Sequence, residues 1–116
     1  MKLPKGMTKG LFDMAVETGD YLPRMAYLIG SFAVHKDDSD REWRLSHRAT
    51  GMGVPGAYAK SLRDAADLAK RLDAAVDWSK VRRTKTVGVV SGLTMARVKT
   101  ARQVLGLDDA VHGRAS

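Results

Sequence analysis

Residues 61–78 read SLRDAADLAKRLDAAVDW, and this stretch decides the fold. Small and apolar residues recur there at the 3.6-residue spacing of an amphipathic helix, while charged residues occupy the opposite side. Ser61 and Asp64 have the spacing of an N-terminal capping box, with Asp in place of the usual Glu or Gln. We therefore predict a helix over 62–76, with Trp78 anchoring its end. Its expected buried stripe comprises Leu62, Ala65, Ala66, Ala69, Leu72, Ala75 and Val76.

The residues upstream of this helix have the composition of β-strands. Residues 25–35 read MAYLIGSFAVH and predict one strand, with faces formed by Leu28, Phe32 and Val34 and by Tyr27, Ser31 and His35. Residues 42–47 alternate in the same way and predict a second strand, with Trp43, Leu45 and His47 on one face. Residues 52–58 contain Pro55 and predict an edge strand, because proline cannot donate to a ladder.

The N-terminal segment allows two interpretations. Thr8 precedes the apolar residues Leu11, Phe12, Ala15 and Val16, a pattern that predicts a short helix ending at Gly19. Residues 17–20 also suit a turn between two strands. With the helix over 62–76, the expected fold class is α+β. A small antiparallel sheet of two to four strands would pack against one main helix, leave its other face open to solvent, and precede a C-terminal helical segment.

The composition describes one small domain. The chain has 116 residues, 44% of them apolar, and no cysteine, which excludes disulfides, thiolate metal sites and cysteine nucleophiles. No run of apolar residues reaches the length of about 18 that is needed to span a membrane. The first residues also lack an apolar leader with a cleavage site. We expect a cytoplasmic protein with no membrane association. Residues 1–80 would form the α+β module and residues 81–116 a basic C-terminal helical segment packed on it.

Basic residues are concentrated toward the C-terminus. Lys and Arg number 20 against 13 Asp and Glu, a net charge of +7. Residues 81–116 hold seven of the basic residues and two of the acidic ones, so this segment carries +5. A local excess of this kind creates a field that attracts polyanions such as nucleic acids.

The C-terminal segment contains a motif-like pattern. Thr94 is a candidate N-cap for a helix that ends before Gly106, with an apolar stripe formed by Met95, Val98, Ala101, Val104 and Leu105. Gly88, Gly92, Leu93 and Val98 have the spacing of the helix-turn-helix of bacterial and phage DNA-binding proteins, which this stretch resembles. The resemblance implies a first helix over 84–90 and a recognition helix from 95 to 103. Residues 84–90 are rich in β-branched side chains around a central glycine, however, and so favour somewhat more a strand that pairs with the sheet and is followed by one terminal helix.

The resemblance also implies which residues contact DNA. Base edges would be met by Thr94, Lys99, Thr100 and Gln103, and phosphates by Arg97 and Arg102. The basic lead-in adds the phosphate-binding candidates Arg82, Arg83 and Lys85. Arg44 and Arg48 share a strand face with Ser46 and form a second candidate surface, for which plain solubilisation of an open face is the alternative.

We find no pattern that supports catalysis, a metal or a cofactor. The histidines at 35, 47 and 112 have no accompanying carboxylate pattern. Asp37, Asp38 and Asp40 lack the glycine and closing glutamate of a calcium loop. The glycines at 51, 53 and 56 are not directly followed by a Lys-Ser/Thr pair, and no serine lies in a nucleophile elbow.

The sequence thus favours a small, non-catalytic DNA-binding or transcription-regulatory accessory protein of phage or mobile-element type. A helix-turn-helix module reads paired half-sites, so a homodimer is expected with it. The alternative is a protein-interaction module that binds or inhibits a host protein without nucleic acid, through exposed Tyr21, Leu22, Met25 and Tyr27.

Overall fold

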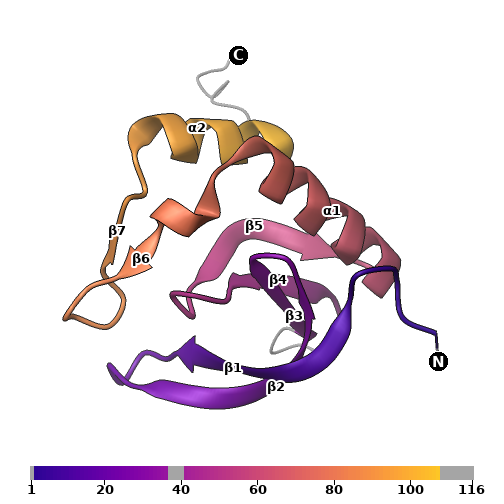
Figure 1. The fold of residues 1–116 in the computed structure, drawn as a ribbon, viewed down its shortest axis with the longest axis horizontal. Helices are drawn as coiled ribbons and strands as arrows, with labels where there is room; N and C mark the ends of the chain where they lie inside the picture. The colour runs from indigo at the N-terminus through magenta and orange to yellow at the C-terminus, as the bar shows by residue number, and fades with distance from the viewer. Residues whose placement is uncertain (1, 37–40, 108–116) are drawn as a thin grey trace.

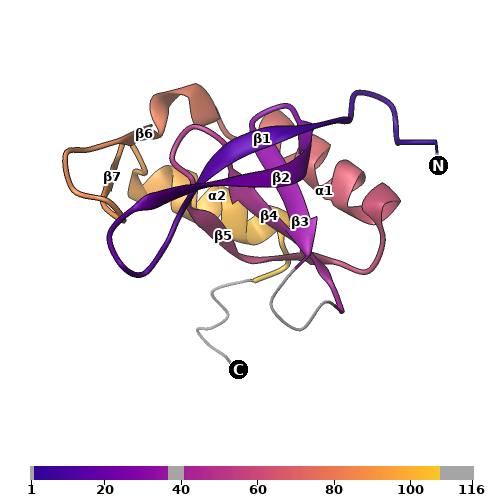
Figure 2. The same ribbon diagram turned by 90° about the horizontal axis from the view of Figure 1, so that it is seen from below.

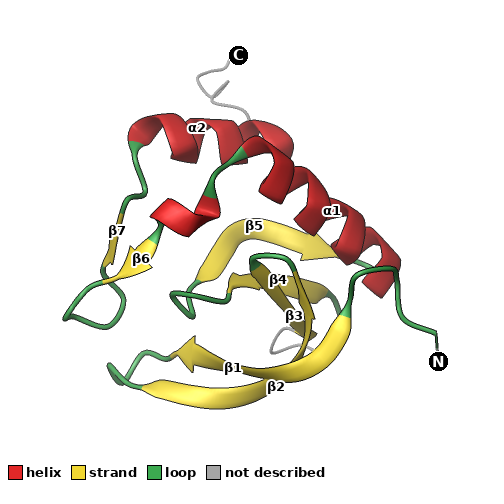
Figure 3. Ribbon diagram, viewed as in Figure 1, coloured by secondary structure: helices red, strands yellow, loops and turns green. Residues whose placement is uncertain are grey.

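A computed structural model describes residues 2–36 and 41–107 of the chain. A five-stranded antiparallel sheet in the order β1-β2-β3-β4-β5 occupies the first half, and two helices with a short two-stranded ribbon follow (Figures 1 and 3). The elements are β1 (Thr8–Ala15), β2 (Tyr21–Ile29), β3 (Phe32–Lys36), β4 (Trp43–His47), β5 (Gly53–Ala59), α1 (Leu62–Ala75), the 3-10 turn η1 (Trp78–Lys80), β6 (Arg82–Arg83), β7 (Val90–Ser91) and α2 (Met95–Val104).

The expected fold class, with two to four strands on one main helix, is wrong. The described residues contain a five-stranded sheet and a second sheet of two strands, so the molecule is dominated by strands. Two segments account for the difference. Residues 8–15 are a strand and not a helix, and residues 25–35 are parts of two strands and not one.

β1 is a strand because its side chains divide between two environments. Its eight residues pair with β2 from Thr8 opposite Leu28 to Ala15 opposite Tyr21. Phe12 is buried while its neighbours Leu11 and Asp13 are exposed, which is a period of two. Residues 17–20 lie in the turn between these strands, where Val16 N–H donates to the carbonyl of Asp20, so the turn interpretation is confirmed.

The reversal between β2 and β3 takes place at Gly30 and Ser31. Gly30 adopts φ +55, a left-handed conformation that glycine tolerates best, and the chain returns antiparallel with Tyr27 opposite Val34. The Asp73 carboxylate of α1 accepts a hydrogen bond of 2.9 Å from Ser31 N–H. Because the chain reverses, the expected faces are mixed. Tyr27 joins Phe32 and Val34 in the main core, whereas Leu28 packs in the second cluster with Ala33.

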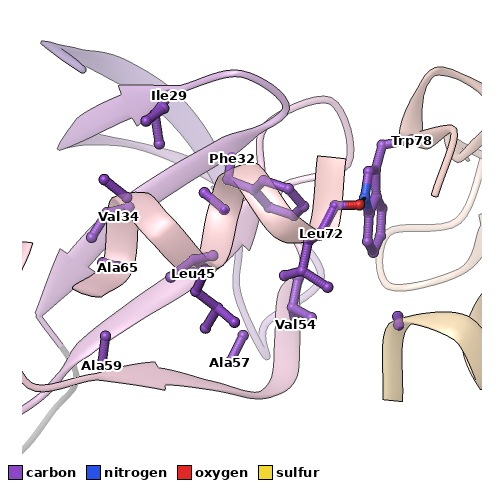
Figure 4. Packing of buried hydrophobic residues seen from close by; sticks show 14 of the residues in the cluster. Ile29, Phe32, Val34, Leu45, Val54, Ala57, Ala59, Ala65, Leu72 and Trp78 are labelled. Carbon is purple, nitrogen blue, oxygen red and sulfur yellow. Dashed lines mark hydrogen bonds between the residues drawn. The ribbon is translucent and has the colours of Figure 1, made fainter. Parts of the chain in front are cut away.

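Helix α1 covers one face of the sheet, and the main core lies between them (Figure 4). It begins after Ser61, whose Oγ accepts from Asp64 N–H at 3.1 Å, in agreement with the expected N-cap. Leu68 is buried and Ala75 is exposed, so the buried stripe differs from the expected one at these two positions. The indole N–H of Trp78 donates to the Leu72 carbonyl at 2.9 Å, and its ring packs edge-on against Phe32.

The opposite face of the sheet is not open to solvent, contrary to expectation. The long β1–β2 hairpin curls across β3 and β4 (Figure 2), and Phe12, Ala26 and Ala33 form a second buried cluster there. Ala15 N–H donates to the Gly51 carbonyl at 2.9 Å, so the end of β1 meets the turn between β4 and β5. The sheet is therefore concave on this side, and Ser46 is buried within it.

The C-terminal elements share the main core. Val81 follows η1, Ala101 lies on α2, and both are buried in the same cluster as Leu45 and Leu72. We call residues 78–107 the C-terminal unit. No helix within 2–36 and 41–107 has the length and apolarity needed to cross a bilayer.

Candidate nucleic-acid interface

The segment that resembles a helix-turn-helix has a different geometry. Residues 84–89 form turns and bends, β7 follows, and α2 is the one helix within 81–107. The strand-plus-helix interpretation is closer, although β7 pairs with β6 and not with the large sheet. Gly92 is at φ +83, where a Cβ atom would overlap the Lys80 carbonyl oxygen. Its role is thus a close approach of β7 to η1, not the crossing of two helices.

β6 and β7 form a short ribbon whose tip is held by its own hydrogen bonds. Arg82 pairs with Ser91, and Arg83 pairs with Val90. At the tip, Thr84 Oγ1 donates to the carbonyl of Val89 at 2.8 Å or of Thr86 at 3.1 Å. Val89 N–H donates to the Thr86 carbonyl at 3.1 Å. These bonds order a tip of small side chains that carries one cation, Lys85.

α2 presents an exposed stripe along its outer side. Met95, Lys99 and Gln103 recur at four-residue spacing and are all exposed, so they share one face of the helix. Met95 is 87% exposed, which corrects the expectation that it belongs to the apolar stripe. Ala101 is the buried residue of the helix, with Val98, Val104 and Leu105 half-buried beside it.

The C-terminal unit carries charge of one sign. Its 30 residues include no Asp or Glu and seven basic residues: Lys80, Arg82, Arg83, Lys85, Arg97, Lys99 and Arg102. All of these are exposed except Arg97 and Arg102, which are half-buried. The unit therefore holds a positive charge equal to that of the whole chain.

Arg83 joins the C-terminal unit to the first hairpin. Its guanidinium lies 3.8 Å from the centre of the Tyr21 ring on β2, and its Nη2 is 3.8 Å from the Asp13 carboxylate on β1. Sequence analysis missed this contact because Tyr21 and Arg83 are far apart in the chain and form no common periodic pattern. Arg83 thus has a structural role in addition to its charge.

The residues expected to read base edges divide into two groups. Lys99 and Gln103 are exposed on the outer stripe of α2. The hydroxyls of Thr94 and Thr100 form hydrogen bonds with the backbone of α2. Thr94 Oγ1 accepts from Arg97 N–H, and Thr100 Oγ1 donates to the Ala96 carbonyl.

The expected phosphate contacts of α2 are less exposed than those of the ribbon. Arg97 Nη1 donates to the Gly92 carbonyl at 2.6 Å, and this bond fixes the turn before the helix. Arg102 lines an apolar cavity of about 180 Å³ between α2, β5 and the turn that precedes β5. Arg82 and Lys85, in contrast, are both exposed on the ribbon.

Arg44 and Arg48 do not form one surface. Arg44 is half-buried on the concave side of the sheet, whereas Arg48 lies beyond the end of β4, exposed, with Nη1 donating to the Gly30 carbonyl. The ladder between β4 and β5 shifts register between Arg44 and Ser46, which breaks the regular alternation expected there.

Two ionisable groups near the C-terminal unit have shifted pKa values. Burial lowers the pKa of His47, opposed by a hydrogen bond with the Trp78 backbone and by the charge of Asp73. The Ser79 hydroxyl, at 2.5 Å from Asp77, lowers the pKa of that exposed carboxylate, and the Ser79 amide and the charges of Lys80 and Arg97 act in the same direction. Asp77 is the N-cap of η1 and precedes the basic run.

The alternative interaction surface is partly exposed. Leu22 and Met25 on β2 are exposed, whereas Tyr21 and Tyr27 are half-buried. Met25 lies directly opposite Leu11 of β1, which is also exposed, so the two form a cross-strand apolar pair. Sequence analysis missed Leu11 because it placed this residue in a helix.

Among residues 2–36 and 41–107, no group of three or more His, Asp or Glu side chains is placed to hold a metal ion. The predictions for His112 and for Asp37, Asp38 and Asp40 lie outside the described residues. Comparison of the chain with protein-family models, with curated proteins and with solved structures finds no match.

Proposed function

We propose that the chain binds duplex DNA through its C-terminal unit, as a cytoplasmic accessory or regulatory protein of phage type. One observation carries the proposal: residues 78–107 hold seven cations and no carboxylate, and five of these cations are exposed, on η1, on the β6–β7 ribbon with its tip, and on α2 (Figure 1). Each cation that meets a phosphate releases condensed counterions, which favours binding at low salt.

The β6–β7 ribbon is the element that fits a groove. The major groove of B-DNA admits a two-stranded β-ribbon as well as a helix. The tip between 84 and 89 is held by internal hydrogen bonds, which reduce the ordering cost of binding. Arg82 and Lys85 would contact phosphates, while Lys99 and Gln103 on α2 provide a second row of polar contacts.

The test compares two triple variants that remove the same charge. Arg82→Ala/Lys85→Ala/Lys99→Ala removes exposed cations of the C-terminal unit, and Lys60→Ala/Arg63→Ala/Lys70→Ala removes exposed cations at and before α1. Affinity for a labelled random-sequence duplex is measured by fluorescence anisotropy over a range of salt concentrations. We expect the first variant to reduce the magnitude of the negative slope of log K against log salt by about 2 to 3, because each phosphate contact contributes about 0.9.

The control variant should keep the wild-type slope. Equal losses in both triple variants would mean that net charge alone attracts the DNA, and would contradict an interface on the C-terminal unit. Absence of binding by the wild type at low salt would contradict DNA binding altogether.

We propose as the second candidate a protein contact on the outer face of the β1–β2 hairpin. The exposed pair Leu11 and Met25 supports it, since contiguous exposed apolar side chains mark interaction surfaces. A second copy of this chain is the partner to test first. Sedimentation equilibrium should show a dimer that Leu11→Ser/Met25→Ser converts to monomer, and a wild type that sediments as a monomer would exclude self-association at this face.

A further inference from the structure

The concave side of the sheet contains a hollow that the proposed DNA interface does not use. One end of this side is filled by Phe12, Ala26 and Ala33. At the other end lies a cavity of about 510 Å³ between the end of β1, the middle of β2, the end of β3 and the start of β4. Its polar lining residues are Glu17, Arg24, His35, Lys36 and Arg44.

Arg24 is held in place at the wall of this hollow. Its Nη2 donates to the Lys36 carbonyl at 3.0 Å, and its Nη1 lies 3.6 Å from the Met14 sulfur. The same Lys36 carbonyl accepts from His35 Nδ1 at 3.1 Å, and His35 Nε2 bonds to Ser46 Oγ at 2.8 Å. His35 also stacks on Phe12 with ring centres 5.6 Å apart. This network fixes the orientation of Arg24 and leaves part of its guanidinium without an acceptor among the described residues.

Arg44 is positioned by packing, since its side chain makes no hydrogen bond with residues 2–36 or 41–107. Its guanidinium lies directly on Gly53, where a Cβ atom would come within 2.6 Å of Nη2. The Tyr58 ring centre is 5.7 Å from its Cζ atom. Its Nε atom is buried and has no hydrogen-bond partner. Arginine stays protonated in proteins, so this buried N–H is a donor that lacks an acceptor.

No carboxylate of the described residues neutralises these two cations. Neither Arg24 nor Arg44 forms an ion pair with residues 2–36 or 41–107. Glu17 lines the same hollow but is exposed and bonded to neither guanidinium. Both side chains are half-buried, so their charges have lost part of their hydration, and a bound anion would offset that loss.

We propose that the hollow binds a small molecule through an oxyanion, a phosphate or a carboxylate group, held by the guanidiniums of Arg24 and Arg44. The volume falls within the range of about 300 to 1,000 Å³ that is usual for small-ligand pockets. Met14, Val16 and Met52 supply apolar wall for the body of such a molecule. The site does not depend on DNA binding, because none of its lining residues belongs to the C-terminal unit.

The first test uses phenyl phosphate and benzoate, which share an aromatic body and differ in the oxyanion. Isothermal titration measures affinity, and the ¹⁵N–¹H signal of Arg44 Nε, a buried atom, reports a change in the surroundings of that guanidinium when a ligand binds. We expect one of the two ligands to bind more tightly and to shift this signal, which identifies the oxyanion. Absence of heat and of a shift with both ligands would overturn the proposal.

Three variants test the assigned residues. Arg44→Gln should weaken binding about tenfold or more, whereas Arg63→Gln, with the same charge loss on the exposed side of α1, should not. Gly53→Ala should also weaken binding, because the added methyl displaces the Arg44 guanidinium. Glu17→Gln should tighten binding several-fold by removing the one carboxylate that faces the hollow among the described residues.

These outcomes separate a built site from general attraction of anions. Equal weakening by Arg44→Gln and Arg63→Gln, or weaker binding by Glu17→Gln, would contradict the proposal. Thermal unfolding of each variant establishes that it is folded, and Glu17→Gln retains both arginines if Arg44→Gln does not fold. Arg82→Ala/Lys85→Ala/Lys99→Ala should bind phenyl phosphate and benzoate as the wild type does.

Discussion

His47 is a residue whose protonation is tied to folding. It is buried at the end of β4, where Nδ1 is 3.0 Å from Thr50 Oγ1 and the ring lies against those of Phe32 and Trp78. The Trp78 backbone and the charge of Asp73 favour the charged ring, but burial is the larger effect. Because desolvation disfavours the charged imidazolium, the folded state prefers the neutral ring.

This preference makes stability depend on pH. The pKa of His47 in the folded state lies below 6.5, its ordinary value, so the unfolded chain binds more protons as the pH falls below 6.5. The free energy of unfolding should therefore decrease with decreasing pH there, by up to about 1.4 kcal/mol per pH unit from this group. Urea unfolding of the wild type and of His47→Gln at a series of pH values measures the slope. An identical slope in both proteins would show that His47 contributes nothing.

At the scale of elements, a close approach at Gly92 helps to position the ribbon, in addition to the contacts of Arg83 with the first hairpin. Gly92 follows β7 and lies against the Lys80 carbonyl of η1, which allows β6 and β7 to pair and α2 to begin at Met95. Gly88, at the ribbon tip, has a similar φ of +89, but a Cβ atom added there would meet no other atom within 4 Å. The two glycines thus share a backbone conformation and differ in their surroundings.

Two alanine substitutions separate these effects. Gly92→Ala and Gly88→Ala both force alanine into the left-handed region, at a cost of about 1 to 2 kcal/mol. Only Gly92→Ala adds an overlap with the Lys80 carbonyl, so we expect it to lower the midpoint of thermal unfolding clearly more than Gly88→Ala does. Equal midpoints would contradict the close packing of β7 on η1.

The sequence predicts some elements well because one face of each has a clear environment. The helix over 62–76 has small residues toward the sheet and charges toward solvent, and α2 begins after Thr94 as expected. The sequence does not predict β1 as a strand, because Leu11 is exposed beside buried Phe12. The apolar positions of this segment therefore have the spacing of a helix. Gly30 is a single residue within an apolar run, and the turn there depends on the pairing of Tyr27 with Val34.

The candidate sites can likewise be predicted from the sequence only where a local pattern marks them. The concentration of charge in residues 78–107 is visible in the sequence, and the exposure of Arg82, Lys85 and Lys99 agrees with it. The hollow at Arg24 and Arg44 cannot be predicted from the sequence. It forms only because β1–β2 curls over β3–β4 and because the register shifts beside Ser46. Such features arise from the closure of the sheet and have no local pattern.

For the whole molecule, one core joins the sheet, α1 and the C-terminal unit. Trp78, Val81 and Ala101 are buried in the cluster that contains Leu45 and Leu72. Figure 4 shows Trp78 with Leu45 and Leu72. The proposed DNA interface and the proposed oxyanion site therefore belong to one cooperative unit, although they share no residue. Loss of contacts at α2 should therefore lower the free energy of unfolding of the whole molecule.

Ala101→Asp tests this shared core, with Gln103→Asp as a control of equal charge on the exposed side of α2. An unpaired carboxylate at a position that is 7% exposed should lower the free energy of unfolding by about 3 kcal/mol or more, whereas Gln103→Asp should change it by less than about 1 kcal/mol. Urea unfolding followed by circular dichroism measures the free energy of unfolding of both variants. A main transition unchanged by Ala101→Asp would mean that α2 folds apart from the rest.

The strand order of the large sheet follows the order of the chain, and this has a kinetic consequence. Each strand from β2 to β5 pairs with the strand made just before it, so no strand waits for a distant partner. Topologies with local pairing fold fast, because little loop-closure entropy opposes each step. During synthesis, the β1–β2 hairpin can form as soon as it leaves the ribosome, and β3 and β4 then add in sequence. The bond from Ala15 to Gly51, which bends the finished sheet back on its first strand, forms only once the turn after β4 has emerged.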